Sequence, residues 1–289
     1  MRLLAQDALF PDWNITENVG NAWDAFVDAS EVVFDALSTF LDDTLVSSVE
    51  WILTTPPPIV VIIALALVAW FSKGWKLGLG TFVAFWAMQS IGYFEPTMES
   101  LAIVLVAALI ALVIGVPLGI LASRSGPASK ILRPVLDFMQ TMPSFVYLML
   151  AVALVGVGAA GGVLASVIFA MPPAVRLTEL GIRQVDKEVV EAAEAFGATP
   201  GEVLRQVQLP LALPTIMAGV NQVIMLSLSM VVIGGLAGGG GIAGNVVEGV
   251  TRLDFGLGIV AGLCVVVLAV FLDRVTSALG GDDGAAAAA

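Results

Sequence analysis

Long apolar runs limit what this chain can fold into more than any other feature of its sequence. A helix needs about 20 apolar residues to cross the hydrocarbon core of a bilayer, and several runs approach that length. Hydrophobic residues make up 58% of the chain, charged residues make up 12%, and the mean hydropathy is +0.99, values far outside the range of soluble domains. Because helices satisfy their own backbone hydrogen bonds in lipid, we expect an all-α, polytopic protein of the cell membrane.

Seven transmembrane helices are expected from these runs. They are 59–71, 77–94, 101–122, 136–156, 162–180, 211–236 and 257–272. Adjacent Pro172 and Pro173 predict a break in the fifth, because proline lacks the N–H that a helix interior uses. We divide the chain into an acidic tail (1–55), two accessory spans (56–94), a core (95–279) and a disordered end (280–289).

The acidic tail carries ten acidic residues before Trp51 and a single basic residue, Arg2. This charge argues against nucleic acid and anionic lipid as its partners. Apolar residues recur in the tail at roughly helical spacing: Val19, Trp23, Phe26, Val33, Leu37, Phe40 and Leu41. The spacing favours an amphipathic helix on the membrane or on the rest of the protein, and a partly ordered tail is the alternative.

The residue inventory excludes several kinds of active site. The chain has no histidine and one cysteine, Cys264, which excludes Cys/His metal sites, Ser-His-Asp triads and Cys-His nucleophiles in this sequence. It contains no Gly-Lys-Ser/Thr string for a P-loop, so any energy that the chain uses must come from a partner or an ion gradient. We therefore expect neither a cofactor nor an enzyme activity in this chain.

Two glycine-rich strings formally match G-x-G-x-x-G, at 156–161 and 239–244. Both lie in expected connections between spans, whereas a dinucleotide site needs this string between a strand and a helix. The longer run 234–244 predicts either a re-entrant or hinged gate, or a flexible loop, since glycine permits tight turns.

A charged segment at 186–210 interrupts the apolar core and predicts two short helices joined by an elbow. Asp186 can cap the first helix, and Gly197 suits the left-handed residue just past its end. Thr199 and Glu202 predict a capping box for the second helix, with Pro200 at its first position. A polar pair of helices between two spans predicts a docking site for another protein.

Within this segment Glu191, Ala192 and Ala193 precede Gly197, and Leu209 and Pro210 close it. These residue types at this spacing resemble the EAA loop of binding-protein-dependent ABC importer permeases, apart from Val207, where isoleucine is usual. The resemblance implies a cytoplasmic coupling element that seats in a groove of a separate ATPase subunit, which binds the ATP. An ordinary surface helix-turn-helix is the alternative.

The basic residues agree with a cytoplasmic position for this segment. With 186–210 inside, ten Lys and Arg residues fall on the cytoplasmic side, and only Arg2 and Arg252 fall outside. Because lysine and arginine concentrate in cytoplasmic loops, we expect the N-terminus outside and the C-terminus inside.

Four longer stretches resemble the osmoprotectant permeases of the glycine betaine/proline type: 136–148, 169–185, 209–238 and 252–262. The resemblance implies a type I importer core, a homodimer of permeases, two ATPase subunits and an extracytoplasmic substrate-binding protein. Permeases for choline, carnitine or an amino acid are alternatives. A transporter driven by an ion gradient is another, against which the segment 186–210 stands.

Polar and thioether side chains within the spans are candidates for the translocation path, because such uncharged groups suit the passage of a polar solute. Met217, Asn221, Met225 and Ser229 follow at four-residue steps on one helix face, and Gln222 flanks it. Met139 and Gln140 lie in the fourth expected span. Helix packing through interhelical hydrogen bonds is the alternative role. All six tryptophans precede the core, which therefore lacks an aromatic cage for a quaternary ammonium.

Overall fold

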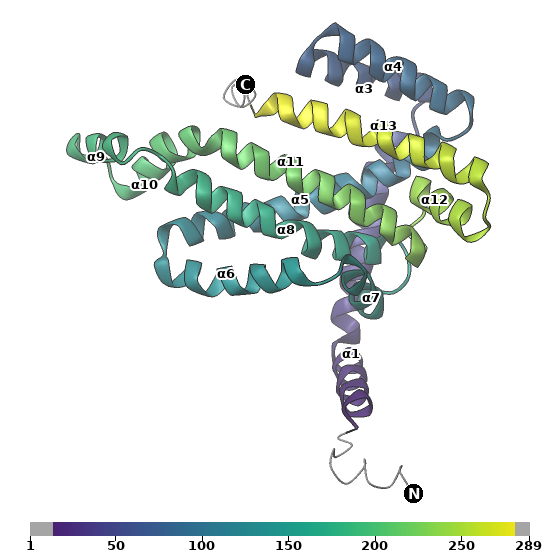
Figure 1. The fold of residues 1–289 in the computed structure, drawn as a ribbon, viewed down its shortest axis with the longest axis horizontal. Helices are drawn as coiled ribbons and strands as arrows, with labels where there is room; N and C mark the ends of the chain where they lie inside the picture. Colours follow the sequence, from purple (N-terminus) through teal and green to yellow (C-terminus); the bar gives the residue numbers. More distant parts are fainter. Residues whose placement is uncertain (1–13, 281–289) are drawn as a thin grey trace, which may run out of the picture.

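The computed structural model describes residues 14–280, and every regular element in that range is a helix (Figure 1). By length and composition four helices can cross a membrane, or up to six if each of two bent pairs counts as one span, rather than the seven expected. The four are α5 (Phe94–Arg124), α8 (Ala159–Arg183), α11 (Leu209–Gly234) and α13 (Phe255–Leu279). The all-α, multi-pass fold is confirmed. Residues 1–13 of the acidic tail and 281–289 of the expected disordered end lie outside the described residues.

The expected span 136–156 is divided between two helices, which is a correction to the sequence-based expectation. Helix α6 (Gly126–Thr141) and helix α7 (Ser144–Val155) meet at an angle of 99°. Met142 between them is extended, with ψ of 137°, and Pro143 follows it. Because the proline ring disfavours a helical conformation at the preceding residue, this dipeptide ends α6 and turns the chain.

The expected break in the fifth span is wrong, because α8 continues through Pro172 and Pro173. Both prolines are buried in its centre. A proline keeps helical φ, and in a membrane bundle the neighbouring helices help to tolerate the backbone hydrogen bonds it removes. Here α8 is packed between α5 and α11, and it remains one continuous helix.

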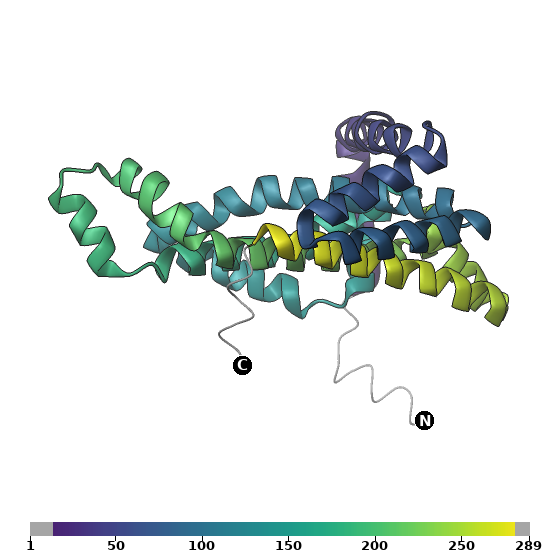
Figure 2. The same cartoon turned by 90° about the horizontal axis from the view of Figure 1, so that it is seen from above.

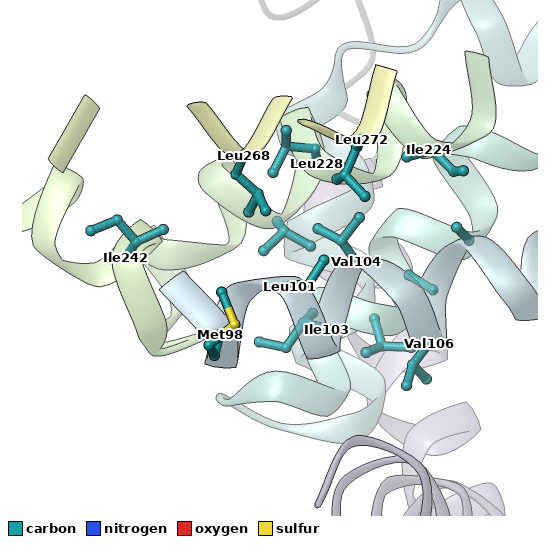
Figure 3. Close-up of a cluster of buried hydrophobic side chains, with 14 of the residues drawn as sticks. Met98, Leu101, Ile103, Val104, Val106, Ile224, Leu228, Ile242, Leu268 and Leu272 are labelled. Carbon is teal, nitrogen blue, oxygen red and sulfur yellow. The ribbon is translucent and has the colours of Figure 1, made fainter. Parts of the chain in front are cut away.

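Glycines bring α5 and α8 into backbone contact. A Cβ at Gly119 would lie 2.6 Å from both the Val175 carbonyl oxygen and the Thr178 Cβ, and one at Gly115 would lie 2.6 Å from the Ala174 Cβ. Small residues at helix interfaces permit this approach in membranes, where packing replaces the hydrophobic effect as the driving force. Figure 3 shows the apolar core around the first half of α5, in which Met98, Leu101 and other α5 residues meet Leu228 of α11 and Leu268 of α13.

Replacing Gly119 tests this helix contact. Gly119→Val should force α5 and α8 apart. The free energy of unfolding should fall by about 1–3 kcal/mol, the usual cost of overpacking. Gly262→Val on α13 is the matched control, because a side chain there meets open space. Thermal unfolding of the two purified variants in the same detergent is the measurement, and equal melting temperatures would contradict the packing argument.

The region of the two expected accessory spans forms a short hairpin, α3 (Pro58–Lys73) and α4 (Trp75–Ser90), which packs against α13 (Figure 1). The turn between them is Gly74, whose φ is +90°. Before the hairpin, α1 (Ile15–Thr39), a π-helical stretch (Phe40–Val46) and α2 (Ser47–Thr54) form one helical segment, set at 100° to α3. The described part of the tail is therefore helical.

The glycine run 234–244 is structured rather than an irregular loop, and its expected role as a re-entrant or hinged gate stays a prediction. It forms a 3-10 turn (Gly235–Ala237) and then enters helix α12 (Gly241–Thr251), which packs on α13 and α5. Gly238, Gly240 and Gly241 have φ between 61° and 71°. The sequence pattern does not predict α12, because glycine is a poor helix former and masks its start.

Candidate coupling site and translocation path

The charged segment forms a helical hairpin that projects beyond the bundle, at the opposite end of the molecule from α12 (Figure 2). It consists of α9 (Lys187–Ala195), the single turn α10 (Pro200–Glu202) and a π-helical stretch (Val203–Gln208) that leads into α11. We call residues 186–208 the coupling hairpin. The 38 residues from Pro200 to Ala237 continue as one helical rod, so the hairpin is attached to a membrane span without an intervening loop.

Local hydrogen bonds fix the shape of the coupling hairpin. The Asp186 carboxylate accepts the backbone N–H of Glu188 at 2.9 Å and so caps α9. Thr199 and Glu202 form the reciprocal capping box, in which the Glu202 carboxylate accepts the Thr199 backbone N–H at 2.7 Å. Hydrogen bonds from the backbone and hydroxyl of Thr199 hold the pKa of this exposed carboxyl below its ordinary value.

Gly197 forms the elbow between the two short helices. Its φ is +89°, in the region that glycine adopts without steric cost and that a branched side chain avoids. The backbone N–H of Gly197 donates to the Glu194 carbonyl, and that of Ala198 donates to the Ala193 carbonyl. These two bonds close the end of α9 and reverse the chain toward α10.

The structure gathers most of the expected coupling residues on one exposed surface. Glu191, Ala192 and Gly197 are exposed and Ala193 is half-buried on the hairpin. Leu209 and Pro210 lie at its base, where Leu209 packs against the small cluster formed by Ile182, Ala212 and Ile216. The first four can contact a partner, whereas Leu209 anchors the hairpin to the bundle.

Phe196 is a surface residue that the sequence pattern does not single out as part of the site. The pattern places it on the apolar face of α9 with Val189, yet its side chain is 94% exposed, at the tip of the hairpin beside Gly197. A large apolar residue directly before an elbow glycine is the sequence signal that could have identified it. Such an isolated aromatic side chain is typical of an interface anchor.

The expected translocation residues lie on two different helices. Met139 and Gln140 are on α6, and the α11 set consists of Met217, Asn221, Gln222, Met225 and Ser229. Both helices pack against α8. Gln140, Gln222 and Ser229 are exposed, and the others are half-buried. Their role in a path remains a prediction.

Asn221 has a specific set of partners on α13. Its side-chain amide donates to the Asp273 carboxylate at 3.0 Å, and its carbonyl oxygen accepts the Thr276 hydroxyl at 2.6 Å. Polar side chains often join membrane helices in this way, so the geometry favours the packing alternative for this residue.

Replacing Asn221 separates these two roles. Asn221→Ala should lower stability by about 0.5–2 kcal/mol, because interhelical hydrogen bonds in membranes contribute that much, and should leave the solute preference unchanged. Gln222→Ala, which removes the exposed neighbouring amide, is the control. Thermal unfolding and competition uptake with several solutes are the measurements. If Asn221→Ala altered the solute preference and left the stability unchanged, Asn221 would be part of the translocation path rather than a packing residue.

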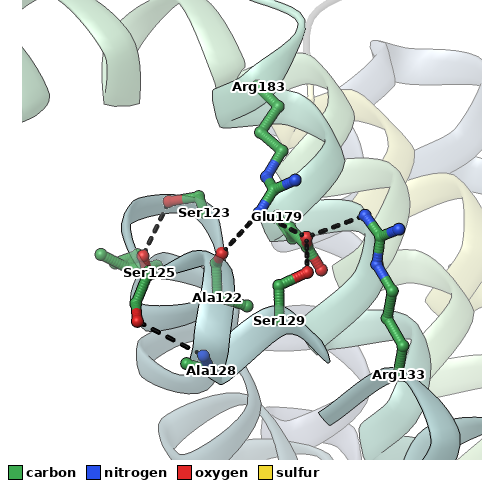
Figure 4. Close-up of polar contacts among 9 residues, drawn as sticks. Ala122, Ser123, Ser125, Ala128, Ser129, Arg133, Glu179 and Arg183 are labelled. Atoms are coloured by element: carbon green, nitrogen blue, oxygen red, sulfur yellow. Dashed lines mark hydrogen bonds and ion pairs between the residues drawn. The ribbon is translucent and has the colours of Figure 1, made fainter. Parts of the chain in front are cut away.

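A buried carboxylate, Glu179, lies near the end of α8 that leads into the coupling hairpin and is held by Ser129, Arg133 and Arg183 (Figure 4). The sequence pattern does not predict this cluster, because Ser129 and Arg133 are distant from Glu179 along the chain.

Comparison with known proteins decides the family. Residues 115–280 match the family described as binding-protein-dependent transport system inner membrane component. The chain belongs to this family. The expectation drawn from Glu191, Ala192, Ala193 and Gly197 is thereby confirmed at the level of the family, and the protein is a multi-pass membrane permease of an ABC transporter.

Curated members of the family are similar over most of this permease. It is 48% identical over 250 residues to the glycine betaine/proline betaine transport system permease protein ProW of Escherichia coli, covering 86% of this chain and 70% of the relative. It is 44% identical over 256 residues to the glycine betaine transport system permease protein OpuAB of Bacillus subtilis, covering 88% and 91%. It is 50% identical over 238 residues to the glycine betaine/carnitine transport permease protein GbuB of Listeria monocytogenes, covering 81% and 84%.

A solved structure shares the permease fold. A structure of the MetNI methionine ABC transporter in an inward-facing conformation aligns with a TM-score of 0.55 at 22% sequence identity, covering 62% of this chain and 92% of that chain. The expected ABC importer permease core is therefore confirmed as a fold.

Proposed function

We propose that this chain is the permease subunit of an ABC importer for a small osmoprotectant of the glycine betaine class. The observation that carries the proposal is the coupling hairpin, an exposed and internally braced element built from the residues that resemble the family's ATPase-docking loop. The substrate class is supported by the 44% to 50% identity to three permeases named for glycine betaine.

The partners follow from the proposed task. A separate ATPase subunit binds the ATP and receives the coupling hairpin, so the permease itself has no catalytic step. An extracytoplasmic binding protein delivers the solute and supplies its selectivity, since the core sequence lacks the tryptophans that an aromatic cage needs. A second copy of the chain completes the pathway as a homodimer.

The proposed orientation places the coupling hairpin and the C-terminus in the cytoplasm and the N-terminal helix outside. Basic residues cluster around the hairpin end, where Arg124, Arg183 and Lys187 surround a cavity of about 470 Å³ between the hairpin and α5. Glu191 and Glu194 line the same cavity, so the orientation rests on the whole chain: ten Lys and Arg residues fall on the hairpin side and two on the other, a bias typical of the cytoplasmic face.

The proposed mechanism is alternating access. ATP binding closes the ATPase dimer and shifts the coupling hairpins seated in it, and each hairpin moves the helices to which it is attached. Because α8 ends at Arg183 and α11 begins at Leu209, immediately before and after the hairpin, these two helices receive the motion first. Loaded binding protein favours one state of the permease and thereby links solute delivery to hydrolysis.

Reconstitution tests the proposed function. Proteoliposomes would contain the permease, its ATPase and its binding protein, with ATP on the ATPase side and radiolabelled glycine betaine outside. We expect uptake that requires ATP and the binding protein. Competition with choline, carnitine and proline distinguishes the alternative solutes. ATP hydrolysis without betaine uptake would reject the substrate, and uptake driven by an ion gradient alone would reject the importer.

A further inference from the structure

The carboxylate of Glu179 is buried in a membrane protein that buries few other charges among its described residues. Its residue is 5% exposed, and one oxygen accepts the Ser129 hydroxyl at 2.7 Å and the Arg133 guanidinium at 3.1 Å. The Arg183 guanidinium lies 3.1 Å from the same oxygen (Figure 4). A buried carboxylate is costly unless it is paired in this way, so the position serves more than generic packing.

The partners of Glu179 join α8 to α6. Ser129 and Arg133 lie on α6, whereas Glu179 and Arg183 lie on α8. Of the residues of α6 only Ser129 and Leu136 are buried, so its polar contacts matter for its position. The ion cluster is therefore the buried polar attachment of α6 to α8, and the second ion pair between these helices, Asp137 with Arg176, is exposed.

The same contacts continue to the coupling hairpin through α5. Arg183 also donates to the Ala122 carbonyl in the last turn of α5, at 2.8 Å. Two residues later Arg124 donates to the carbonyl of Pro200, the first residue of α10, at 3.3 Å. An unbroken series of contacts thus runs from the hairpin through α5 and α8 to α6.

Helix α6 leads directly to the bend before α7. Its last turn is tied to α7 by the Tyr147 hydroxyl, which donates to the Met139 carbonyl. A displacement of α6 is therefore transmitted to α7, which packs against α8 and α1.

We propose that Glu179 is a positioning residue that makes α6 move with α8 when the coupling hairpin is displaced. The inference rests on the proposed function, because it assumes that an ATPase moves the hairpin. Without the carboxylate, Arg133 and Arg183 lose their common acceptor, and the exposed Asp137–Arg176 pair is the ion pair that still joins α6 to α8. Hydrolysis then continues, but the motion does not reach α6 and α7, so ATP is consumed without solute import.

The groove beside Glu179 offers a matched control. Asp137 forms an ion pair with Arg176 in the same groove, but its side chain is 66% exposed and no hydrogen bond links it to α5 or to the hairpin. Glu179→Gln and Asp137→Asn therefore make the same chemical change at neighbouring positions. Glu179 belongs to the series of contacts that reaches the hairpin, and Asp137 does not.

The experiment measures uptake and ATP hydrolysis stimulated by loaded binding protein in the same proteoliposomes. For Glu179→Gln we expect roughly 5-fold or more ATP hydrolysed per solute imported, the range of ordinary allosteric coupling. Asp137→Asn should keep the wild-type ratio, and Glu179→Asp should restore part of it. An unchanged ratio in Glu179→Gln, or equal loss of uptake and hydrolysis, would overturn the inference, since a purely structural defect lowers both together.

A second measurement does not depend on the transported solute. Spin labels at Ile131 on α6 and Leu79 on α4, two exposed positions, report the movement of α6 when nucleotide is trapped in the complete complex. We expect the distance to change in the wild type and to stay fixed in Glu179→Gln. Equal changes in both would overturn the inference. Absence of solute uptake by the wild type would instead count against the proposed substrate.

Arg124 gives an independent check from the other end of the contact series. Arg124→Ala removes the bond to Pro200, so adding Glu179→Gln should raise the ratio of ATP to solute little further. In the double variant Arg124→Ala with Asp137→Asn, the effects of the two changes on the ratio of ATP to solute should add, as expected for unconnected sites. Additive effects of Arg124→Ala and Glu179→Gln would contradict a single connected series.

Discussion

Gly197→Val is expected to abolish solute uptake while the permease still inserts and folds in the membrane. A Cβ at this position meets no neighbouring atom, so the penalty is conformational. A branched side chain at φ of +89° costs about 1–3 kcal/mol. The elbow must then open, which moves Phe196 and Glu191 away from their places on the docking surface.

Matched variants on the same hairpin make this test specific. Gly201→Val also adds its side chain into open space, but the φ of Gly201 is not positive, so uptake should largely survive. Gly197→Asn should retain more activity than Gly197→Val, because asparagine tolerates positive φ better than other residues. Uptake assays with parallel thermal unfolding provide the readout. Normal uptake by Gly197→Val would mean that the elbow is not needed for docking.

Phe196→Ala should weaken the complex between the permease and its ATPase by roughly 30-fold or more, the loss typical of an interface anchor that contributes at least about 2 kcal/mol. The side chain is 94% exposed in this chain, so its removal should not change the stability of the isolated permease. Weaker binding and unchanged stability are both expected because Phe196 is exposed in this chain and would be covered only by the partner protein.

Phe255→Ala is the control for this second prediction. Phe255 is 74% exposed as well, but it lies at the start of α13, next to α12 at the other end of the molecule. Titration of the ATPase onto permease in nanodiscs gives the affinity of each variant. Equal affinities for the wild type and Phe196→Ala would show that the tip of the hairpin does not enter the interface.

The coupling hairpin could be predicted from the sequence because its shape is set by neighbouring residues. Asp186 caps the helix that follows it, Thr199 and Glu202 cap each other, and Gly197 has the expected positive φ. Each of these signals acts over two to four residues. The long apolar helices α5, α11 and α13 were predictable for a similar reason, since hydropathy is a local average.

Features that depend on distant contacts could not be predicted in this way. The prolines of α8 predict a break, but α5 and α11 pack against the helix and keep it continuous. Pro143, in contrast, does end α6, although the apolar residues around it predict an uninterrupted span. Two of the three partners of Glu179, Arg133 and Ser129, lie 46 and 50 residues away along the chain, so no local pattern reveals the cluster.

The short α3–α4 hairpin has a consequence for the surrounding lipid. Each helix has 16 residues and so spans about 24 Å, less than the roughly 30 Å of an average hydrocarbon core. Exposed Trp70 and Trp75 flank the turn at one end, where indole rings settle at the headgroup level. As membrane spans, helices this short would be met by local thinning of the bilayer or by flanking side chains that reach the headgroups, at a cost that grows with each ångström of mismatch. The free-energy cost of this mismatch depends on the acyl-chain length of the lipids. Because the hairpin packs against α13, a change in bilayer thickness would act on α13 and on the bundle through this contact.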